Sequence, residues 1–488
     1  MRNQKRAALA LACALHCAAA LAAVESPAPA AGEPPAPAPA VASTDDLVTL
    51  ATRRNAAQQT FLRLSDEKRM AEARDIAGQI VELTVRLYGA TSIEMAAPLT
   101  NLATTQLALG DLAGAAQNYR AAIDLVEHGE GPASPRLVNP LLGLGETCIR
   151  SGLYDQARDA YQRALRVNHV DAGFYNVEQF PIMDGLSEAW LGLDQLEQAN
   201  AQQTTQVAIQ RQRSGSASEE LVPVLYKLGR WYNRTGQYVE SRNAFQTARR
   251  IIREQGGDTD PASVDALLGE ALTYTNEGAM PASASTLKRA LEVLDGQPER
   301  DHRKRAEVLV ALGDLYTLNR QPRAAGQRYG QAWHELSGDT ALEADRDGYF
   351  GQVSRISGPR LPAAVGADGR ARSEAPGLRS TWPRGAVLAE FTVDADGDAH
   401  DIRIVESDPP GLIDQQVLRV LAATAFRPRL ADGVPIGTTG VTFRHEFRHE
   451  PPAAAPPAKG NPQEDTDQDG GRLEFPDTAD PPAGADGR

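Results

Sequence analysis

The run from His445 to His449 has the residue types and spacing of a zinc hydrolase motif. It reads His-Glu-Phe-Arg-His, and on a helix such spacing puts both imidazoles on one face to bind Zn²⁺ while the glutamate polarises a bound water. The residues before it alternate between apolar and polar, and Pro451 and Pro452 follow it. Alternation predicts a strand, in which the two histidines lie about 13 Å apart. No later histidine offers a third ligand, so a zinc hydrolase is the least favoured interpretation.

The acidic run from Asp465 to Gly470 begins like a calcium-binding loop. Its aspartates occupy positions 1, 3 and 5 of such a loop, and the glycine at position 6 permits the bend. Position 12 is Pro476 instead of a bidentate glutamate, and neither flank predicts a helix. We interpret the run as part of a solvated acidic tail and keep calcium binding as the alternative. The similar cluster from Asp394 to Asp398 predicts the turn of a hairpin.

A third group of polar residues offers cationic and amide donors at helical spacing. Its members are Tyr226, Lys227, Arg230, Asn233 and Arg234. Donors grouped on one side of a helix can hold a peptide carboxylate or an acidic segment. The alternative interpretation is an ordinary solvated surface.

This group belongs to a stretch that repeats every 42 residues. One copy contains Leu228, Gly229, Tyr232, Gly236, Tyr238, Phe245 and Ala248, and the copy 84 residues earlier contains Leu144, Gly145, Cys148, Gly152, Tyr154, Tyr161 and Ala164. Apolar or small residues recur at helical intervals on both sides of a turn, which predicts two antiparallel amphipathic helices per unit. The turn falls at seven positions, namely Lys68, Gly110, Gly152, Asp194, Gly236, Gly278 and Arg320.

The Leu-Gly, Tyr, Gly-x-Tyr, Phe and Ala pattern of these units resembles the tetratricopeptide repeat, in the longer 42-residue variant also found in kinesin light chains. The resemblance implies that residues 45–336 form a mainly α, right-handed solenoid of about seven helical hairpins with a concave groove. The cationic group near Arg230 is then expected to face this groove. Cys148 occupies the aromatic position of its unit, so we expect it in the core.

After a linker at 337–383, with one short helix at most, a different pattern begins. Val387, Ala389, Phe391 and Val393 alternate with less apolar residues, as in a half-buried strand. The aspartate-rich turn, a return strand at 402–405, a helix at 412–425 and a last strand at 441–447 follow. The expected order is therefore strand, strand, helix, strand.

This ββαβ unit at 384–449 resembles the C-terminal domain of TonB-type energy transducers. The resemblance depends on Gly385, Val387, the Phe391 to Gly397 segment, Val405, Ser407, Phe426, Pro428, Asp432, Gly433, Pro435, Phe443 and Phe447. The family usually has a Tyr-Pro and a helix before the first strand, whereas Trp382 and Pro383 adjoin it here. The resemblance implies that a partner adds a strand to the edge formed by Val441, Phe443, His445 and Phe447.

The two ends of the chain have compositions unlike a packed core. Residues 1–22 place Arg2, Lys5 and Arg6 before an alanine and leucine run, which is the pattern of a cleaved signal peptide. An uncleaved anchor at 7–24 is the main alternative, and a lipid anchor at Cys17 is disfavoured because His16 precedes it. The segment 23–44 is rich in Pro and Ala, and the tail at 450–488 is acidic, so we expect disorder in both.

Composition and motifs exclude several classes of function. The formal charge of −14 becomes about −17 once the basic leader is removed, which argues against nucleic acid as a partner. The sequence shows no pairing of nucleophile and base, no phosphate loop and no ligand cluster, so we expect neither an enzyme nor a bound cofactor. We expect a periplasmic scaffold that binds proteins or peptides, including envelope proteins or outer-membrane receptors. The alternative is a transducer anchored in the inner membrane, which touches the membrane through an uncleaved leader.

Overall fold

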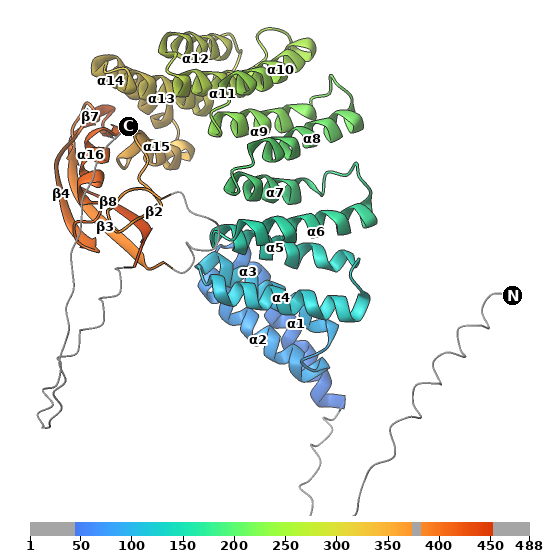
Figure 1. The fold of residues 1–488 in the computed structure, drawn as a ribbon. Coiled ribbons are helices and arrows are strands. Elements are labelled where there is room, and N and C mark those ends of the chain that lie inside the picture. The colour runs from blue at the N-terminus through green and yellow to red at the C-terminus, as the bar shows by residue number, and fades with distance from the viewer. Residues whose placement is uncertain (1–43, 373–381, 452–488) are drawn as a thin grey trace, which may run out of the picture.

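The computed structural model describes residues 44–372 and 382–451. Helices pair off along the chain into a curved stack, and a small strand-rich unit follows on the inner side of the curve (Figure 1). The expected signal peptide, nearly all of the Pro/Ala-rich segment, the acidic tail and the candidate calcium loop lie outside the described residues. Among the described residues, no helix combines the length and the apolar character needed to cross a membrane.

The stack consists of seven helical hairpins, which confirms the expected solenoid. Short 3₁₀ turns, η1 (Ile93–Met95) and η2 (Pro135–Leu137), lead into the second and third hairpins. The hairpins are α1 (Thr44–Asp66) with α2 (Met70–Tyr88), α3 (Ala96–Leu109) with α4 (Leu112–Glu130), α5 (Val138–Arg150) with α6 (Tyr154–Ala172), α7 (Phe180–Gly192) with α8 (Leu196–Ser214), α9 (Leu221–Arg234) with α10 (Tyr238–Gly256), α11 (Ser263–Glu277) with α12 (Met280–Asp295), and α13 (His302–Leu318) with α14 (Pro322–Ser337).

Every predicted turn position has a left-handed backbone. The four glycines have φ between 74° and 87°, and Lys68, Asp194 and Arg320 have φ of 57°, 58° and 54°. This conformation lets the chain reverse between the two helices of a unit, and it favours glycine because a Cβ crowds the following carbonyl. The three residues other than glycine therefore hold some backbone strain.

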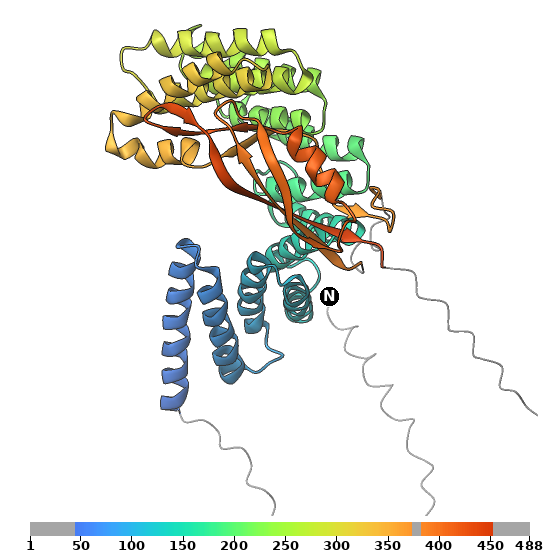
Figure 2. The ribbon, with the colours of Figure 1, turned by 90° about the vertical axis from the view of Figure 1, so that its left-hand side faces the viewer.

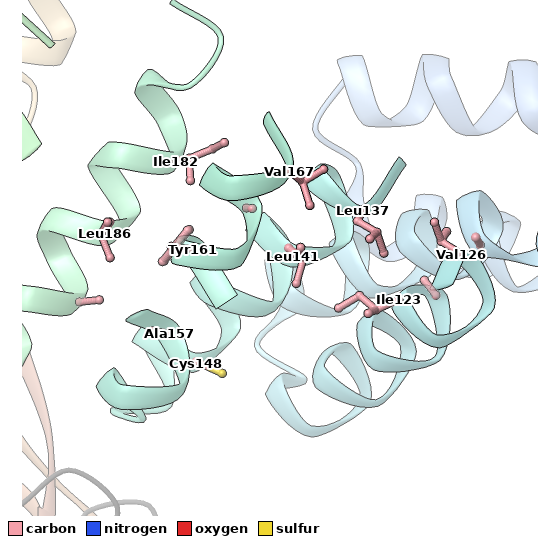
Figure 3. Close-up of a cluster of buried hydrophobic side chains, with 14 residues drawn as sticks. Ile123, Val126, Leu137, Leu141, Cys148, Ala157, Tyr161, Val167, Ile182 and Leu186 are labelled. Carbon is pink, nitrogen blue, oxygen red and sulfur yellow. The ribbon is translucent and has the colours of Figure 1, made fainter. Parts of the chain in front are cut away.

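The units stack through aromatic rings that lie against glycines. A Cβ on Gly229 would lie 2.7 Å from the Phe245 ring of the same unit, and one on Gly269 of the next unit would lie closer still. Tyr161 packs in the same way between two glycines, within a core that Figure 3 shows running across neighbouring units. Cys148 is 2% exposed in this core, and burial raises the pKa of its thiol. The prediction that Cys148 is buried is confirmed.

The C-terminal unit contains the expected strand, strand, helix, strand order with shorter strands added. Its elements are η3 (Thr340–Leu342), α15 (Glu343–Phe350), β1 (Ser354–Ser357), β2 (Ala364–Val365), β3 (Arg384–Val393), β4 (Ala399–Asp408), α16 (Asp414–Ala422), β5 (Ala425–Arg427), β6 (Arg429–Ala431), β7 (Val434–Ile436) and β8 (Thr438–His449). The main sheet has the order β2-β8-β3-β4, and two small sheets pair β1 with β5 and β6 with β7. The segment expected as a linker thus also carries β1 and β2.

Alternation along β3 determines which face of the main sheet is buried. Val387, Ala389, Phe391 and Val393 are buried, and they pack with residues of α16 such as Leu421. Figure 2 shows α16 lying along the sheet, whose strands extend away from the last repeats. β8 pairs antiparallel with β3 from Arg448 to Thr438, while β2 pairs parallel only with its last two residues.

An ion-pair network joins the start of α13 to the end of α14. The carboxylate of Glu335 accepts hydrogen bonds from Arg300 at 3.1 Å and from Arg305 at 3.1 Å, and it lies 2.7 Å from the His302 ring nitrogen. Burial opposes ionisation of Glu335, but these hydrogen bonds outweigh it and lower its pKa to about 2. The network therefore favours the folded last hairpin whenever Glu335 is ionised.

Replacing Lys68 with glycine should stabilise the first hairpin. The Lys68→Gly substitution removes the Cβ that strains the left-handed turn, for a gain of about 1 kcal/mol. Chemical denaturation followed by circular dichroism measures this as a higher midpoint. Lys68→Ala keeps the Cβ and serves as the control, so an equal gain in both variants would show that strain is not the cause.

The Glu335 network predicts a pH-dependent stability. A carboxyl whose pKa falls from about 4.3 to about 2 on folding contributes roughly 3 kcal/mol above pH 5, and this is lost as the pH drops through 4 towards 2. Glu335→Gln should therefore be less stable than the parent at pH 7, with the difference shrinking on acidification. The exposed pair of Glu292 with Arg289 provides the control, because Glu292→Gln should change stability little at any of these pH values. A Glu335→Gln deficit independent of pH would contradict the assignment.

Candidate protein-binding surfaces

Three of the five predicted groove residues gather around one cavity on the inner side of the solenoid. Helix α9 buries Leu221, Leu225 and Leu228 against its neighbours, and the helical period then turns Lys227, Arg230 and Arg234 towards the groove. The cavity has a volume of about 270 Å³ and is lined by Asp184, Glu188, Gln203, Lys227, Arg230, Trp231 and Arg234.

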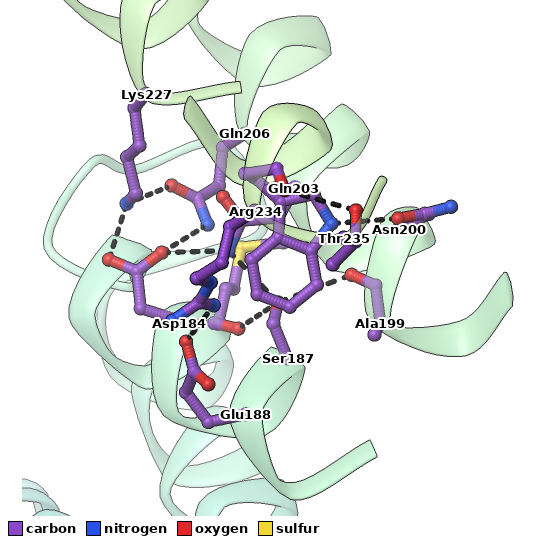
Figure 4. A network of polar contacts seen from close by, with 12 residues as sticks. Asp184, Ser187, Glu188, Ala199, Asn200, Gln203, Gln206, Lys227, Arg234 and Thr235 are labelled. Atoms are coloured by element: carbon purple, nitrogen blue, oxygen red, sulfur yellow. Dashed lines mark hydrogen bonds and ion pairs between the residues drawn. The ribbon is translucent and has the colours of Figure 1, made fainter. Parts of the chain in front are cut away.

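Two of the three cations already have carboxylate partners on α7. Lys227 pairs with Asp184 and donates to Gln206 at 2.7 Å, while Gln203 and Gln206 each donate to Asp184 at 3.0 Å (Figure 4). Arg234 pairs with Glu188, and its guanidinium lies 4.8 Å from the centre of the Trp231 ring. These contacts hold both side chains in place and cancel most of their charge.

Arg230 keeps its charge available for a ligand. It is exposed, lines the same cavity as the two ion pairs, and forms no ion pair with any described carboxylate. The ion pairs of Lys227 with Asp184 and of Arg234 with Glu188 hold the side chains around Arg230 in place. A ligand carboxylate placed over α9 would therefore meet Arg230 first.

The other two predicted groove residues join α9 to α11. Tyr226 donates to the Ala262 carbonyl at 3.3 Å, and burial raises the pKa of its hydroxyl to about 12. Asn233 is buried and accepts a hydrogen bond of 3.0 Å from Asn276. Both residues lie beside the groove and help to position its helices.

Sequence reasoning missed the carboxylates of this cavity. Glu188 lies one 42-residue period before Arg230, so carrying the groove offsets back by one unit would have placed it opposite that position. Asp184 aligns in the same way with Tyr226. Charge alone did not reveal them, because acidic residues occur on most of the described helices.

Strand β8 contains both histidines of the zinc-like motif. The His445 ring lies 3.0 Å from the Pro362 carbonyl, and the His449 ring lies 3.2 Å from the Glu450 carbonyl. Across residues 44–372 and 382–451, no group of three or more His, Cys, Asp or Glu side chains is placed to hold a metal ion.

The outer edge of β8 is open along much of its length. His449 donates its backbone N–H towards β3, whereas Arg448 donates to Ala363 on the other side. Because the direction alternates along a strand, Thr442 and Arg444 present their N–H and C=O groups at the outer edge. The side chains of Val441, Phe443, His445 and Phe447 lie on the core face instead, with the three rings stacked in a row. The predicted edge residues thus shape the strand, while their even-numbered neighbours carry its open backbone.

The C-terminal unit is fixed to the last hairpin by a partly buried ion pair. Arg427 of β5 donates to both carboxylate oxygens of Asp314 on α13, at 2.9 and 2.6 Å. Tyr329 donates to the same carboxylate at 2.9 Å. Leu430 of β6 joins the apolar cluster of α13 and α14 that contains Phe350. The sheet is therefore held at a defined place beside the groove.

The geometry defines a class of protein, a helical repeat solenoid that ends in a small domain of strands and one helix. Family comparisons identify both parts. Residues 220–294 match the tetratricopeptide repeat, and residues 383–448 match the Gram-negative bacterial TonB protein C-terminal. The chain therefore contains tetratricopeptide repeats followed by a TonB-type C-terminal domain, and both predicted resemblances are confirmed. Such domains point to interactions with other proteins and are typically non-catalytic.

Solved structures resemble the repeats at low sequence identity. TPR-like repeats assigned to a kinesin light chain of Podosopora anserina are 16% identical, covering 42% of this chain and 97% of theirs at a TM-score of 0.38. BtubC (BKLC) from P. vanneervenii is 18% identical, covering 52% and 96% at a TM-score of 0.34. A tetratricopeptide repeat protein from Parabacteroides merdae is 15% identical, covering 61% and 98% at a TM-score of 0.35. The search of curated proteins found no match.

Removing the Arg427 guanidinium should loosen the C-terminal unit from the solenoid. Arg427→Met leaves the Asp314 carboxylate without its main partner in a side chain that is 21% exposed, at a cost of about 2 kcal/mol. Limited proteolysis should then separate the two units up to about 30-fold faster. Arg403→Met is the matched control, since its pair with Glu390 is exposed and lies within one sheet. Equal cleavage of both variants and the parent would contradict a holding role for Arg427.

Proposed function

We propose that this protein is a periplasmic scaffold that binds envelope proteins at two surfaces. One surface is the solenoid groove around Arg230, and the other is the outer edge of β8, to which a partner adds a strand. The TonB-type match associates the chain with the Gram-negative envelope, which supports a periplasmic location after signal-peptide removal.

The observation that carries this proposal is the open backbone of β8 beside a groove that is held in place. An exposed strand edge is a template for another strand, and proteins normally cover such an edge when it has no use. Here β2 covers only Arg448 and His449. The Arg427 to Asp314 pair keeps this edge and the groove on one body, so one partner can contact both.

The TonB-type domain also supports a second candidate, an energy transducer. This function requires that residues 7–24 remain in the inner membrane as an anchor, with the repeats as a spacer towards outer-membrane receptors. N-terminal sequencing of the protein from fractionated native envelope decides between the two. A mature start near Ala23 in the soluble periplasm supports the scaffold, and an intact Met1 in the inner membrane supports the transducer.

Blocking the edge of β8 should abolish partner capture. Arg444→Pro removes an outward backbone donor while leaving the hydrogen bonds to β3, because in this part of β8 the odd-numbered residues on either side of Arg444 bond to β3. Affinity capture from native envelope extract, quantified by mass spectrometry, should lose its specific partners at least tenfold.

The control for this experiment is Arg444→Ala, which removes the same side chain and keeps the N–H. The control should capture the partners as well as the parent does. Loss in both variants would assign the effect to the guanidinium, and retention in both would exclude strand addition at this edge.

A further inference from the structure

A second cavity lies where the groove meets the C-terminal unit. It has a volume of about 350 Å³, within the range of ligand sites. Three helices of the solenoid, α11, α12 and α13, form most of it, and strand β1 of the C-terminal unit closes one side. The residues that decide its character are Leu268 and Leu272 of α11, Met280 of α12, Leu315 and Leu318 of α13, and Arg355 of β1.

This cavity continues the groove of α9 in register. Leu272 lies one 42-residue period after Arg230, and Leu318 lies two periods after Arg234. A hydrogen bond of 3.0 Å from Asn276 to Asn233 connects the two cavities. Asn276 lines the second cavity, and Asn233 is the chain neighbour of Arg234, which lines the first. The groove thus changes from a charged section over α9, where Arg230 has no carboxylate partner, to an apolar section over α11 and α13.

The apolar section has no occupant among the described residues. Leu272 is 52% exposed although it borders an apolar cavity. At the rim, Arg355 donates to the Pro359 carbonyl at 2.7 Å and forms no ion pair with a described carboxylate. The Asp314 carboxylate nearby is taken by Arg427. A matching ligand therefore presents bulky apolar side chains with carboxylates close by.

The chain carries such a segment in its own C-terminal tail. Between 452 and 488, Leu473 and Phe475 are the two large apolar residues. Asp467 and Asp469 precede them, and Glu474 lies between them. In the tail, the aspartates come before Leu473 and Phe475. In the groove, Arg230 on α9 likewise comes before the apolar cavity at α11 and α13, so the two orders match.

We propose that residues 467–475 bind in this groove, with Leu473 and Phe475 in the cavity between α11, α13 and β1 and the preceding aspartates over Arg230. The inference rests on the proposed groove function and adds an intramolecular ligand that competes with partners.

The distances allow this placement. Four residues separate Asp469 from Leu473, which span about 13 Å when extended, and packed helices lie about 8–10 Å apart. The tail leaves β8 at Pro451, about one strand length or roughly 40 Å from the end of the sheet that meets α13. The 22 residues from Pro451 to Leu473 reach up to about 70 Å, so the segment can fold back onto its own groove.

A labelled synthetic peptide of residues 462–480 tests the proposal by fluorescence anisotropy on full-length protein. In the intact chain the tail competes with the peptide, so binding should be weak. The double substitution Leu473→Ser with Phe475→Ser in the chain should free the groove and tighten peptide binding at least tenfold. Thr466→Ala with Thr478→Ala, elsewhere in the tail, is the control and should leave binding weak.

The location is tested in the freed chain with one further pair of variants. Leu272→Asp should weaken peptide binding at least tenfold, whereas Val239→Asp, at a residue of α10 that is 55% exposed, should not. Equal peptide binding to the intact and freed chains would overturn the proposal, as would an unchanged affinity in Leu272→Asp. Dimers that the peptide dissociates would show that the tail binds a second copy instead.

Failure here is distinguishable from failure of the proposed function. If the peptide does not bind but partner capture still depends on the β8 edge, only the intramolecular ligand is excluded. If capture also fails, the scaffold function is excluded as well.

Discussion

The packing of a ring between two glycines is the constraint on which the rest of this structure depends. Phe245 lies against Gly229 of its own unit and Gly269 of the next, and Tyr161 repeats the arrangement two units earlier. A side chain at either glycine would hold the helices apart, so the ring determines how closely successive units approach. The same spacing gives Arg230 and Leu272 equivalent positions on α9 and α11, one period apart. The groove's character can therefore change from one unit to the next without any change in its shape.

The end of the solenoid raises a different physical problem, because the last hairpin has no following unit to cover its apolar face. Here the C-terminal domain supplies the cover, with Leu430 packed among Tyr329, Leu336 and Phe350. Arg427 adds a charged contact that an apolar cap lacks, and its bidentate geometry with Asp314 determines the orientation as well as the position. A domain expected to hang from a linker is thus part of the solenoid's terminal core.

Periodicity explains how much the sequence could predict. The seven turns, the buried Cys148 and the order of the long strands all follow from repeats of 42, 3.6 or 2 residues, and the structure confirms them. Contacts outside any period could not be foreseen. Asp314 and Arg427 lie 113 residues apart, and the strands from β5 to β7 have three residues each, too few to show alternation. Within the groove, the partners of Lys227 and Arg234 come from another unit, so the sequence alone could not show that Arg230 is the cation left without a carboxylate partner.

The cap on the last hairpin also restricts how this protein can change in length. A 42-residue unit could be added or removed without breaking the contacts to the C-terminal domain only upstream of α13, because α13 and α14 carry the residues that make those contacts. Each inserted unit would lengthen the groove and place the first hairpin farther from the β8 edge. The final hairpin and the C-terminal domain would therefore be retained together in related proteins. The number of preceding units could differ from one related protein to another.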